Sequence, residues 1–153
     1  MRRMWSALAL VLVTAAPAAA QPSVGFQAGG SIDPEQFFAG VHWQSPELSG
    51  RFAFRAGLDG GFGSDLRIAT INVDFLFFFP LGGTNWSLIQ GGGPTVVITR
   101  YGYDGTDLDE TDVGAGGSYV IGFAHERGFF TEARIGSGRV PTLKFGAGWR
   151  LEF

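Results

Sequence analysis

Bulky apolar side chains occupy every second position between residue 142 and the final Phe153, and small or charged side chains occupy the positions between them. Successive side chains of an extended strand point to opposite faces, so this segment has one apolar face and one polar face. Such a strand fits a wall with lipid on one side and water or polar side chains on the other. The apolar face consists of Leu143, Phe145, Ala147, Trp149, Leu151 and Phe153, and the opposite face of Thr142, Lys144, Gly146, Gly148, Arg150 and Glu152.

The same alternation recurs after residue 20 in about eight runs, which clusters of Gly, Pro, Asn, Asp and Ser separate. An even number of strands closes a barrel with both termini on the same side. We therefore predict an all-β fold, an eight-stranded antiparallel up-and-down transmembrane β-barrel. The predicted strands cover residues 24–30, 37–44, 51–62, 66–79, 86–101, 111–125, 129–136 and 142–153.

Residues 1–20 have the order of a cleavable secretory signal peptide: two arginines, a short apolar core, and small residues up to Ala20. The core is shorter than the roughly 20 residues that a membrane-spanning helix needs. We predict cleavage after Ala20 and one barrel domain of residues 21–153. Cleavage takes the formal net charge from −3 to −5 and leaves no basic patch for nucleic acid. The absence of cysteine excludes disulfides and thiolate zinc sites.

The composition separates two kinds of barrel. The chain contains 25 Gly and 15 Phe and is 45% hydrophobic, yet it has no long apolar segment. An eight-stranded barrel is only just wide enough inside for side chains, so the aromatic positions cannot all face inward. The polar positions are also too rich in Gly, Ala and Ser for a solvated exterior. A soluble, lipocalin-like barrel is the alternative, and a mature protein that stays monomeric without detergent would support it.

Connections and aromatic residues suggest how the barrel lies in the membrane. Compact turns at 45–50, 80–85 and 126–128 are expected on the periplasmic side, with both termini, and the acidic segment 102–110 on the outer side. Trp and Tyr favour the two interfaces of a bilayer. The predicted aromatic girdle consists of Trp43, Trp86 and Trp149 at the periplasmic edge, with Tyr101 and Tyr103 at the outer edge.

One set of charged residues shares the parity that is expected to face the lumen. Unpaired charges in a narrow lumen would be costly, so we predict a ladder of ion pairs and hydrogen bonds. A hairpin through residues 63–65 would place Arg55 opposite Asp74. The network is either a packed polar plug or a gated ion path, and planar-bilayer recording distinguishes them. Its predicted members are Arg51, Arg55, Asp59, Asp74, Glu132, Arg134, Lys144, Arg150 and Glu152.

Irregularities are expected at two places within the predicted strands. The alternation slips near Ala69, where we predict a bulge or the start of a loop. The Gly-Gly-Gly-Pro segment at residues 91–94 lacks the Lys-Ser/Thr and the helix start of a phosphate-binding loop. A kink, a bulge or a close strand approach is therefore expected there.

Other candidate sites are weaker. The carboxylates between Tyr101 and Asp112 are suitable Ca²⁺ ligands, but their spacing departs from the EF-hand pattern, so a solvated acidic loop is expected. His42 is expected to be a lumen residue with hydrogen-bond partners, and His125 to flank a turn. Both lie near the predicted periplasmic edge, far from an outer-leaflet substrate, and no serine stands two residues after His125. We expect no catalytic residue, metal ligand or cofactor.

The signal peptide, the alternating runs and the closing segment from Lys144 to Phe153 resemble the small outer-membrane β-barrel family of OmpA-type and OmpX-type proteins. The resemblance implies residence in the cell outer membrane and contact with its lipids. It also implies that Phe153 is the signal read by the outer-membrane assembly machinery, and we expect no periplasmic domain. The expected function is structural or adhesive, through surface loops whose ligand is unknown, with residues 104–112 making any partner contact. A narrow ion or solute channel and a lipid-modifying enzyme are the alternatives.

Overall fold

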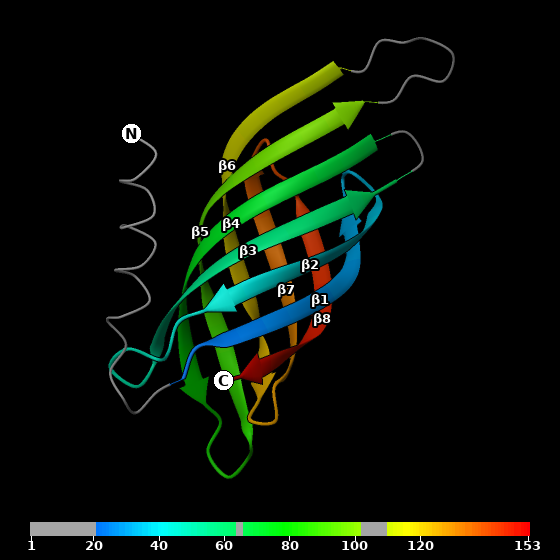
Figure 1. Ribbon diagram of the computed structural model, residues 1–153. Helices are drawn as coiled ribbons and strands as arrows, with labels where there is room; N and C mark the ends of the chain where they lie inside the picture. Colours follow the sequence, from blue (N-terminus) through cyan, green and yellow to red (C-terminus); the bar gives the residue numbers. More distant parts are fainter. Residues whose placement is uncertain (1–20, 64–65, 102–109) are drawn as a thin grey trace.

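The computed structural model describes residues 21–63, 66–101 and 110–153, which form one closed antiparallel barrel (Figure 1). Each strand pairs with the next along the chain, and β8 pairs with β1. The predicted eight-stranded up-and-down fold is confirmed, with strand bounds that differ from prediction by at most two residues. The predicted signal peptide, residues 1–20, lies outside the described residues. The strands are β1 (Ser23–Ile32), β2 (Gln36–Gln44), β3 (Phe52–Phe62), β4 (Leu66–Pro80), β5 (Trp86–Tyr101), β6 (Glu110–His125), β7 (Phe129–Gly138) and β8 (Leu143–Glu152).

In the part of the chain that the structure describes, no helix is long and apolar enough to cross a membrane.

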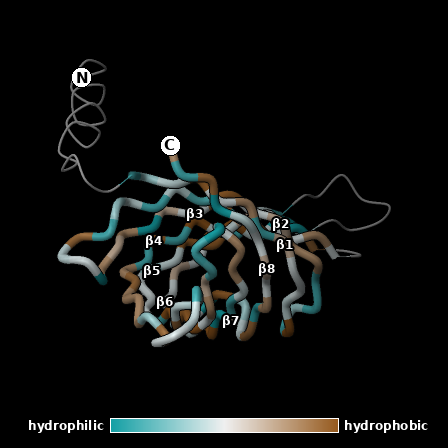
Figure 2. The backbone as a smooth tube through the Cα atoms, turned by 90° about the horizontal axis from the view of Figure 1, so that it is seen from below, coloured by the Kyte–Doolittle hydropathy of each residue, from teal (hydrophilic) through white to brown (hydrophobic). Residues whose placement is uncertain are grey.

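The alternation of the sequence becomes a partition between the two faces of the wall. On β8, Phe145 and Trp149 point outward and are 53% and 48% exposed. Lys144, next to Phe145 on the same strand, points inward and is buried in the lumen. Seen from below, hydrophilic and hydrophobic positions alternate along the wall (Figure 2). An unpaired polar backbone group is costly in lipid, and a closed barrel leaves no strand edge unpaired. Closure of the barrel and the outward apolar face therefore both suit a lipid bilayer.

The two ends of the barrel differ. The turns after β2, β4 and β6 lie at the end that also carries Phe153, and we call this the short-turn end (Figure 1). The opposite end carries the connections after β1, β3, β5 and β7, and we call it the loop end. Strands β4, β5 and β6 have 15, 16 and 16 residues, whereas β1 and β2 have 10 and 9, so the wall is tallest along β4–β6.

The predicted bulge near Ala69 is wrong. Ala69 pairs regularly with Gly60 on one side and Ile98 on the other. The apparent slip arose because an apolar residue, Ile68, faces the lumen at this level and is buried there. The β4–β5 register is interrupted instead opposite Pro94, which has no N–H to donate to the ladder.

The glycines before Pro94 mark a close approach of strands, as one of the sequence interpretations held. A Cβ atom on Gly91 would collide with the backbone oxygen of Phe75, and one on Gly93 with that of Val73. Glycine is needed here because the β4 backbone occupies the space of any side chain.

Candidate functional site in the barrel lumen

Four charged residues form a compact group in the lumen, which we call the arginine cluster: Arg55, Asp74, Glu132 and Arg134. Arg134 binds Asp74 in a bidentate manner, with Nη1 and Nη2 donating to Oδ1 and Oδ2 over 2.9 and 2.7 Å. Arg55 donates from Nη2 to Asp74 Oδ2 over 3.2 Å, and from Nη1 across the lumen to Glu132 Oε2 over 2.8 Å. Their side chains are 1–7% exposed, so these are buried, charge-assisted contacts.

A second group, the lysine cluster, lies closer to the loop end and is built around Asp59. Lys144 Nζ donates to Asp59 Oδ2 over 2.8 Å, and Gln27 Nε2 donates to Oδ1 over 2.6 Å. Thr70 and Asn72 donate to Oδ2 over 3.2 and 3.0 Å. The ammonium of Lys144 also lies 4.1 Å from the centre of the Phe38 ring.

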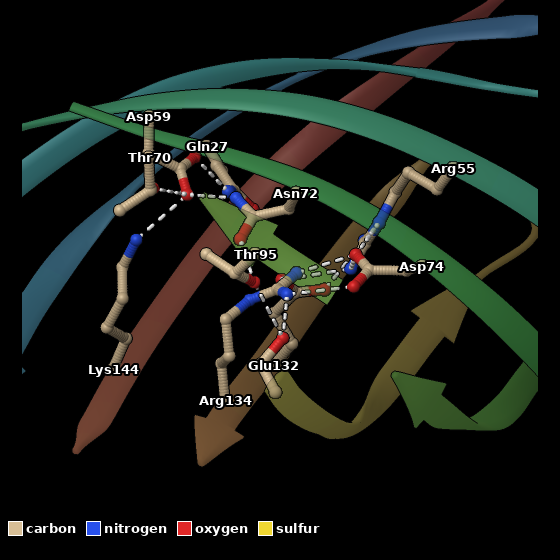
Figure 3. A network of polar contacts seen from close by, with 11 residues as sticks. Gln27, Arg55, Asp59, Thr70, Asn72, Asp74, Thr95, Glu132, Arg134 and Lys144 are labelled. Atoms are coloured by element: carbon tan, nitrogen blue, oxygen red, sulfur yellow. Dashed lines mark hydrogen bonds and ion pairs between the residues drawn. The ribbon is translucent and has the colours of Figure 1, made fainter. Parts of the chain in front are cut away.

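The two clusters are joined into one network (Figure 3). Thr95 donates to Asn72 Oδ1 over 2.9 Å and lies 3.3 Å from Ser118 Oγ, which accepts from Arg134 Nη1 over 2.7 Å. The network contains three cations and three carboxylates and is therefore formally neutral. Neutrality and complete pairing are the conditions under which charges tolerate burial.

Strand register explains how the chain builds this network. Arg55 is directly opposite Asp74, as the predicted hairpin requires, and Asp59 is opposite Thr70. Arg134 and Lys144 are also directly opposite, but each turns to a different carboxylate. Like charges in register would otherwise repel.

Glycines on the lumen side make room for these long side chains. A Cβ on Gly40 would collide with the carboxylate of Asp59, and one on Gly122 with the backbone and Cβ of Glu132. Gly25 lies in the same way against the ring of His42. A small barrel is thus filled by pairing small and large residues on adjacent strands.

Below the network, toward the short-turn end, the lumen is apolar, which the sequence reasoning missed. Leu76 and Phe78, whose alternation was ambiguous at the end of the fourth predicted strand, face inward and are buried. A better signal was available, because they share the parity of Asp74 on β4. The apolar layer consists of Ala53, Leu76, Phe78, Ile89, Val120, Ala124 and Phe130.

His42 lies beside this layer, and its predicted hydrogen bonding is wrong. Its ring faces inward, is 4% exposed, and packs edge-on against Phe130 with 5.3 Å between ring centres. Neither ring nitrogen has a hydrogen-bond partner among the described residues. His125 flanks a turn, where its Nδ1 accepts from the backbone N–H of Arg127 over 3.1 Å. Neither histidine is paired with a serine or a carboxylate in the described contacts.

Three predicted network members lie outside the two clusters. Arg51 precedes β3 and is exposed, and Glu152 ends β8 and is also exposed. Arg150 is half-buried near the short-turn end, where its guanidinium lies 5.7 Å from the centre of the Phe78 ring. Its Nε has no hydrogen-bond partner among the described residues. The other six predicted members are those that the structure brings together.

Some of the predicted girdle residues lie on the outward face as expected, and others do not. Trp43 and Trp149 are 39% and 48% exposed on the outward face near the short-turn end, and Trp86 begins β5 at that end and packs on His125. Tyr101 lies at the loop end, but on the same side of β5 as Val97, which faces the lumen. Tyr103 and residues 104–109 of the acidic loop lie outside the described residues.

The space left inside the network is small. Two cavities flank Lys144, and each has a volume of about 10 Å³. A cavity of that size holds about one water molecule. Among the described residues, no group of three or more His, Cys, Asp or Glu side chains is arranged to hold a metal ion. The arrangement suits a rigid, occupied lumen.

Comparison with known proteins shows which structures share this fold. No protein-family model and no curated protein sequence matches the chain. Among solved structures, the N-terminal barrel domain of Pseudomonas aeruginosa OprF is similar with a TM-score of 0.61 and 13% identity, over 88% of this chain and 99% of that one. Neisserial surface protein A has a TM-score of 0.61 and 12% identity, over 87% and 95% of the two chains. The chain has the fold of the small outer-membrane β-barrels.

A third barrel of this kind is Ail, the attachment invasion locus protein of Yersinia pestis, with a TM-score of 0.53 and 14% identity over 86% of this chain and 97% of that one. The predicted resemblance to OmpA-type and OmpX-type barrels is therefore confirmed for the fold.

Proposed function

We propose that this chain is an integral protein of the cell outer membrane, with a closed lumen and with outer loops that have a structural or surface-interaction role such as adhesion. The height of the outward apolar face supports the location. On β4 the outward residues from Ala69 to Phe79 span ten residue steps. At about 3.3 Å per residue and a strand tilt of about 40°, this is a band of roughly 25 Å, the height of the lipid-facing band of such barrels.

Closure of the lumen is supported by its two layers. An ion that crossed the barrel would have to displace the network between Asp59 and Glu132, whose carboxylates are already satisfied by internal cations. It would then have to pass the apolar layer around Leu76 and Phe130, whose side chains offer no polar atom in place of its hydration shell. The continuous network above an apolar layer is the observation that carries the proposal.

Planar-bilayer recording tests this closure. The purified protein is expected to insert without giving stable unitary conductance. A matched variant that trims one side chain from each layer, R134S/F130A, is expected to conduct more than the wild type and shows that the assay senses the lumen. Reproducible unitary conductance from the wild-type protein would overturn the closed lumen in favour of a narrow channel.

The surface role is supported by the fold and by the acidic sequence of the segment that connects β5 and β6. One similar structure is a neisserial surface protein, and another is the attachment invasion locus protein of Yersinia pestis. The segment 102–109 connects the two longest strands at the loop end and contains Asp104, Asp107 and Asp109.

A loop exchange tests this role. Cells that lack the gene are complemented with the full chain or with a chain in which residues 104–109 are replaced by Gly and Ser. Adherence to host-cell and abiotic surfaces is expected to fall with the exchanged loop, while the band shift between unheated and boiled samples stays intact. Equal adherence of the two strains would reject a binding role for this loop. A purely structural role would then show as increased envelope permeability in cells without the gene.

Catalysis is not part of the proposal. The lumen position of His42 separates it from lipid, and His125 lies at the short-turn end, opposite the proposed outer leaflet. An unchanged mass of lipid A in cells that express the protein is the expected result. A loss or gain of one acyl chain would restore the lipid-modifying alternative.

A further inference from the structure

The connection between β7 and β8, residues 139–142, covers the lumen at the loop end, and we call it the lid. Within it, Pro141 is buried and Val140 is half-buried. Pro141 lines both of the small cavities that flank Lys144. One of these cavities also touches residues of β4 to β7, and the other touches residues of β1 to β4. The lid therefore reaches over the lysine cluster from one wall of the barrel toward the others.

Three glycines on the lumen side of the wall leave space for the lid. A Cβ on one of them, Gly114, would collide with the side chain of Arg139, and a Cβ on another, Gly136, with the backbone oxygen of Pro141. A side chain at any of these positions would push the lid away from the wall. The chain thus provides a fitted seat, which consists of Gly114 and Gly116 on β6 and Gly136 on β7.

Polar contacts anchor the lid at its two ends. At one end, Arg139 Nη1 lies 3.2 Å from Asp112 Oδ2 and donates to the backbone oxygen of Val113 over 3.3 Å. At the other end, the backbone N–H of Thr142 donates to the backbone oxygen of Asp33 over 3.1 Å. The Arg139–Asp112 pair, which we call the latch, joins side chains that are 63% and 46% exposed. An exposed pair is weak and is screened by salt, unlike the buried pairs below the lid.

We propose that residues 139–142 form a salt-sensitive lid, which opens without unfolding of the barrel and admits solvent to the lysine cluster. Segments held by exposed contacts open locally at a lower free energy than the core that they cover. The latch contributes to the closed position, so weakening it shifts the lid toward the open one. This inference goes beyond the closed lumen of the proposed function, because the arginine cluster and the apolar layer lie deeper and stay in place when the lid opens.

A thiol placed under the lid tests its opening. The chain has no cysteine, so one introduced thiol reports on one position. Thr70 is 3% exposed and lines both cavities below Pro141, and its replacement, Thr70→Cys, gives up one 3.2 Å contact with Asp59 in every variant alike. The rate of alkylation by iodoacetamide, a small uncharged reagent, is measured by mass spectrometry on the barrel in nanodiscs. The T70C barrel is expected to react at least about 100-fold more slowly than the same chain unfolded in urea.

Three variants in the T70C background separate the cover from the latch. V140G/P141G removes the side chains that cover the cavities and is expected to react at least about tenfold faster. R139Q removes the latch and is expected to react about two- to fivefold faster, the effect of one exposed pair. About 1 M salt, at which the Debye length is about 3 Å, is expected to accelerate T70C by a similar factor and to leave T70C/R139Q unchanged. The control R127Q changes an exposed arginine in the turn after β6, at the other end of the barrel, and is expected to alter neither the rate nor its salt dependence.

Alkylation of T70C at the rate of the unfolded chain, or no acceleration in V140G/P141G, would overturn the lid. Equal salt dependence with and without Arg139 would overturn the latch, and this comparison decides the question if V140G/P141G loses its heat-dependent gel shift. Planar-bilayer recording keeps the proposed function separate. All lid variants are expected to stay silent because the apolar layer is intact, whereas unitary conductance from the wild type with a protected thiol would refute the closed lumen and leave the lid in place.

Discussion

Replacement of Asp74 by Asn is the sharpest test of the lumen network. Asp74 receives the bidentate contact from Arg134 at 2.9 and 2.7 Å and a second contact from Arg55 at 3.2 Å, and its side chain is 1% exposed. Asn keeps the shape but removes the charge, so the two guanidinium groups are left with Glu132 as the carboxylate of their cluster. Breaking a buried pair in this way costs about 3–5 kcal/mol.

The free energy of unfolding is measured by urea titration in lipid vesicles, with the fluorescence of Trp43, Trp86 and Trp149 as the signal. A loss of 3 kcal/mol corresponds to a more than roughly 100-fold change in the folding equilibrium constant. The matched control is Asp112→Asn, which breaks the Arg139–Asp112 pair at 3.2 Å between side chains that are 63% and 46% exposed. An exposed pair contributes about 0–1 kcal/mol.

A second variant separates the cost of leaving buried charges unpaired from the loss of the ion pairs themselves. Replacing all four residues of the arginine cluster, as R55M/D74L/E132L/R134M, removes every charge together. Such exchanges are neutral or stabilising by about 1–4 kcal/mol in buried sites, so this variant is expected to be more stable than D74N. If D74N lost no more stability than D112N, the lumen would be hydrated enough to screen its charges, and the reasoning from a dry, occupied interior would be refuted.

Three further predictions concern single residues. Gly91→Ala places a Cβ against the Phe75 backbone and is expected to abolish the heat-dependent gel shift of the refolded barrel. The control Gly82→Ala, with no atom within 4 Å of the new Cβ, is expected to leave the gel shift intact. A normal gel shift for both variants would contradict the close approach of β4 and β5. His42→Leu removes two unpartnered buried nitrogens and is expected to raise the free energy of unfolding by about 1–3 kcal/mol, and a loss of stability would mean that the ring has a partner. Deletion of Phe153 is expected to lower the amount of barrel in the outer membrane of cells without changing refolding in detergent, and equal amounts in cells would remove its role as assembly signal.

The wall of the barrel was predictable because each side of it has a different solvent. Lipid outside and packed polar groups inside impose a period of two that survives in every strand, so the strand bounds and the opposition of Arg55 and Asp74 followed from spacing alone. The error at Ala69 has the same origin. Apolar Ile68 faces inward there, and a rule that sends every bulky residue outward reads it as a slip.

The interior was less predictable because its contacts cross the lumen. Arg55 reaches Glu132 on the opposite wall, and no register of neighbouring strands reports the distance between β3 and β7. The choice of partner by Arg134 and Lys144, which are adjacent in register, likewise depends on where carboxylates lie across the barrel. Glycines such as Gly40 report only the adjacent strand, where the missing side chain leaves room for its register partner Asp59.

The layered lumen implies that stability and closure are controlled by different residues. Charge pairing at mid-height contributes to the free energy of unfolding of the barrel, because an unpaired ion there is removed from bulk water. Passage of ions is limited by the layer below, where Leu76, Phe78 and Phe130 present no polar atom. An intact apolar layer therefore keeps the D74N barrel silent in planar bilayers even while its free energy of unfolding falls. Conductance from D74N that equalled that of R134S/F130A would instead place the whole barrier in the arginine cluster and leave the apolar layer without a role in closure.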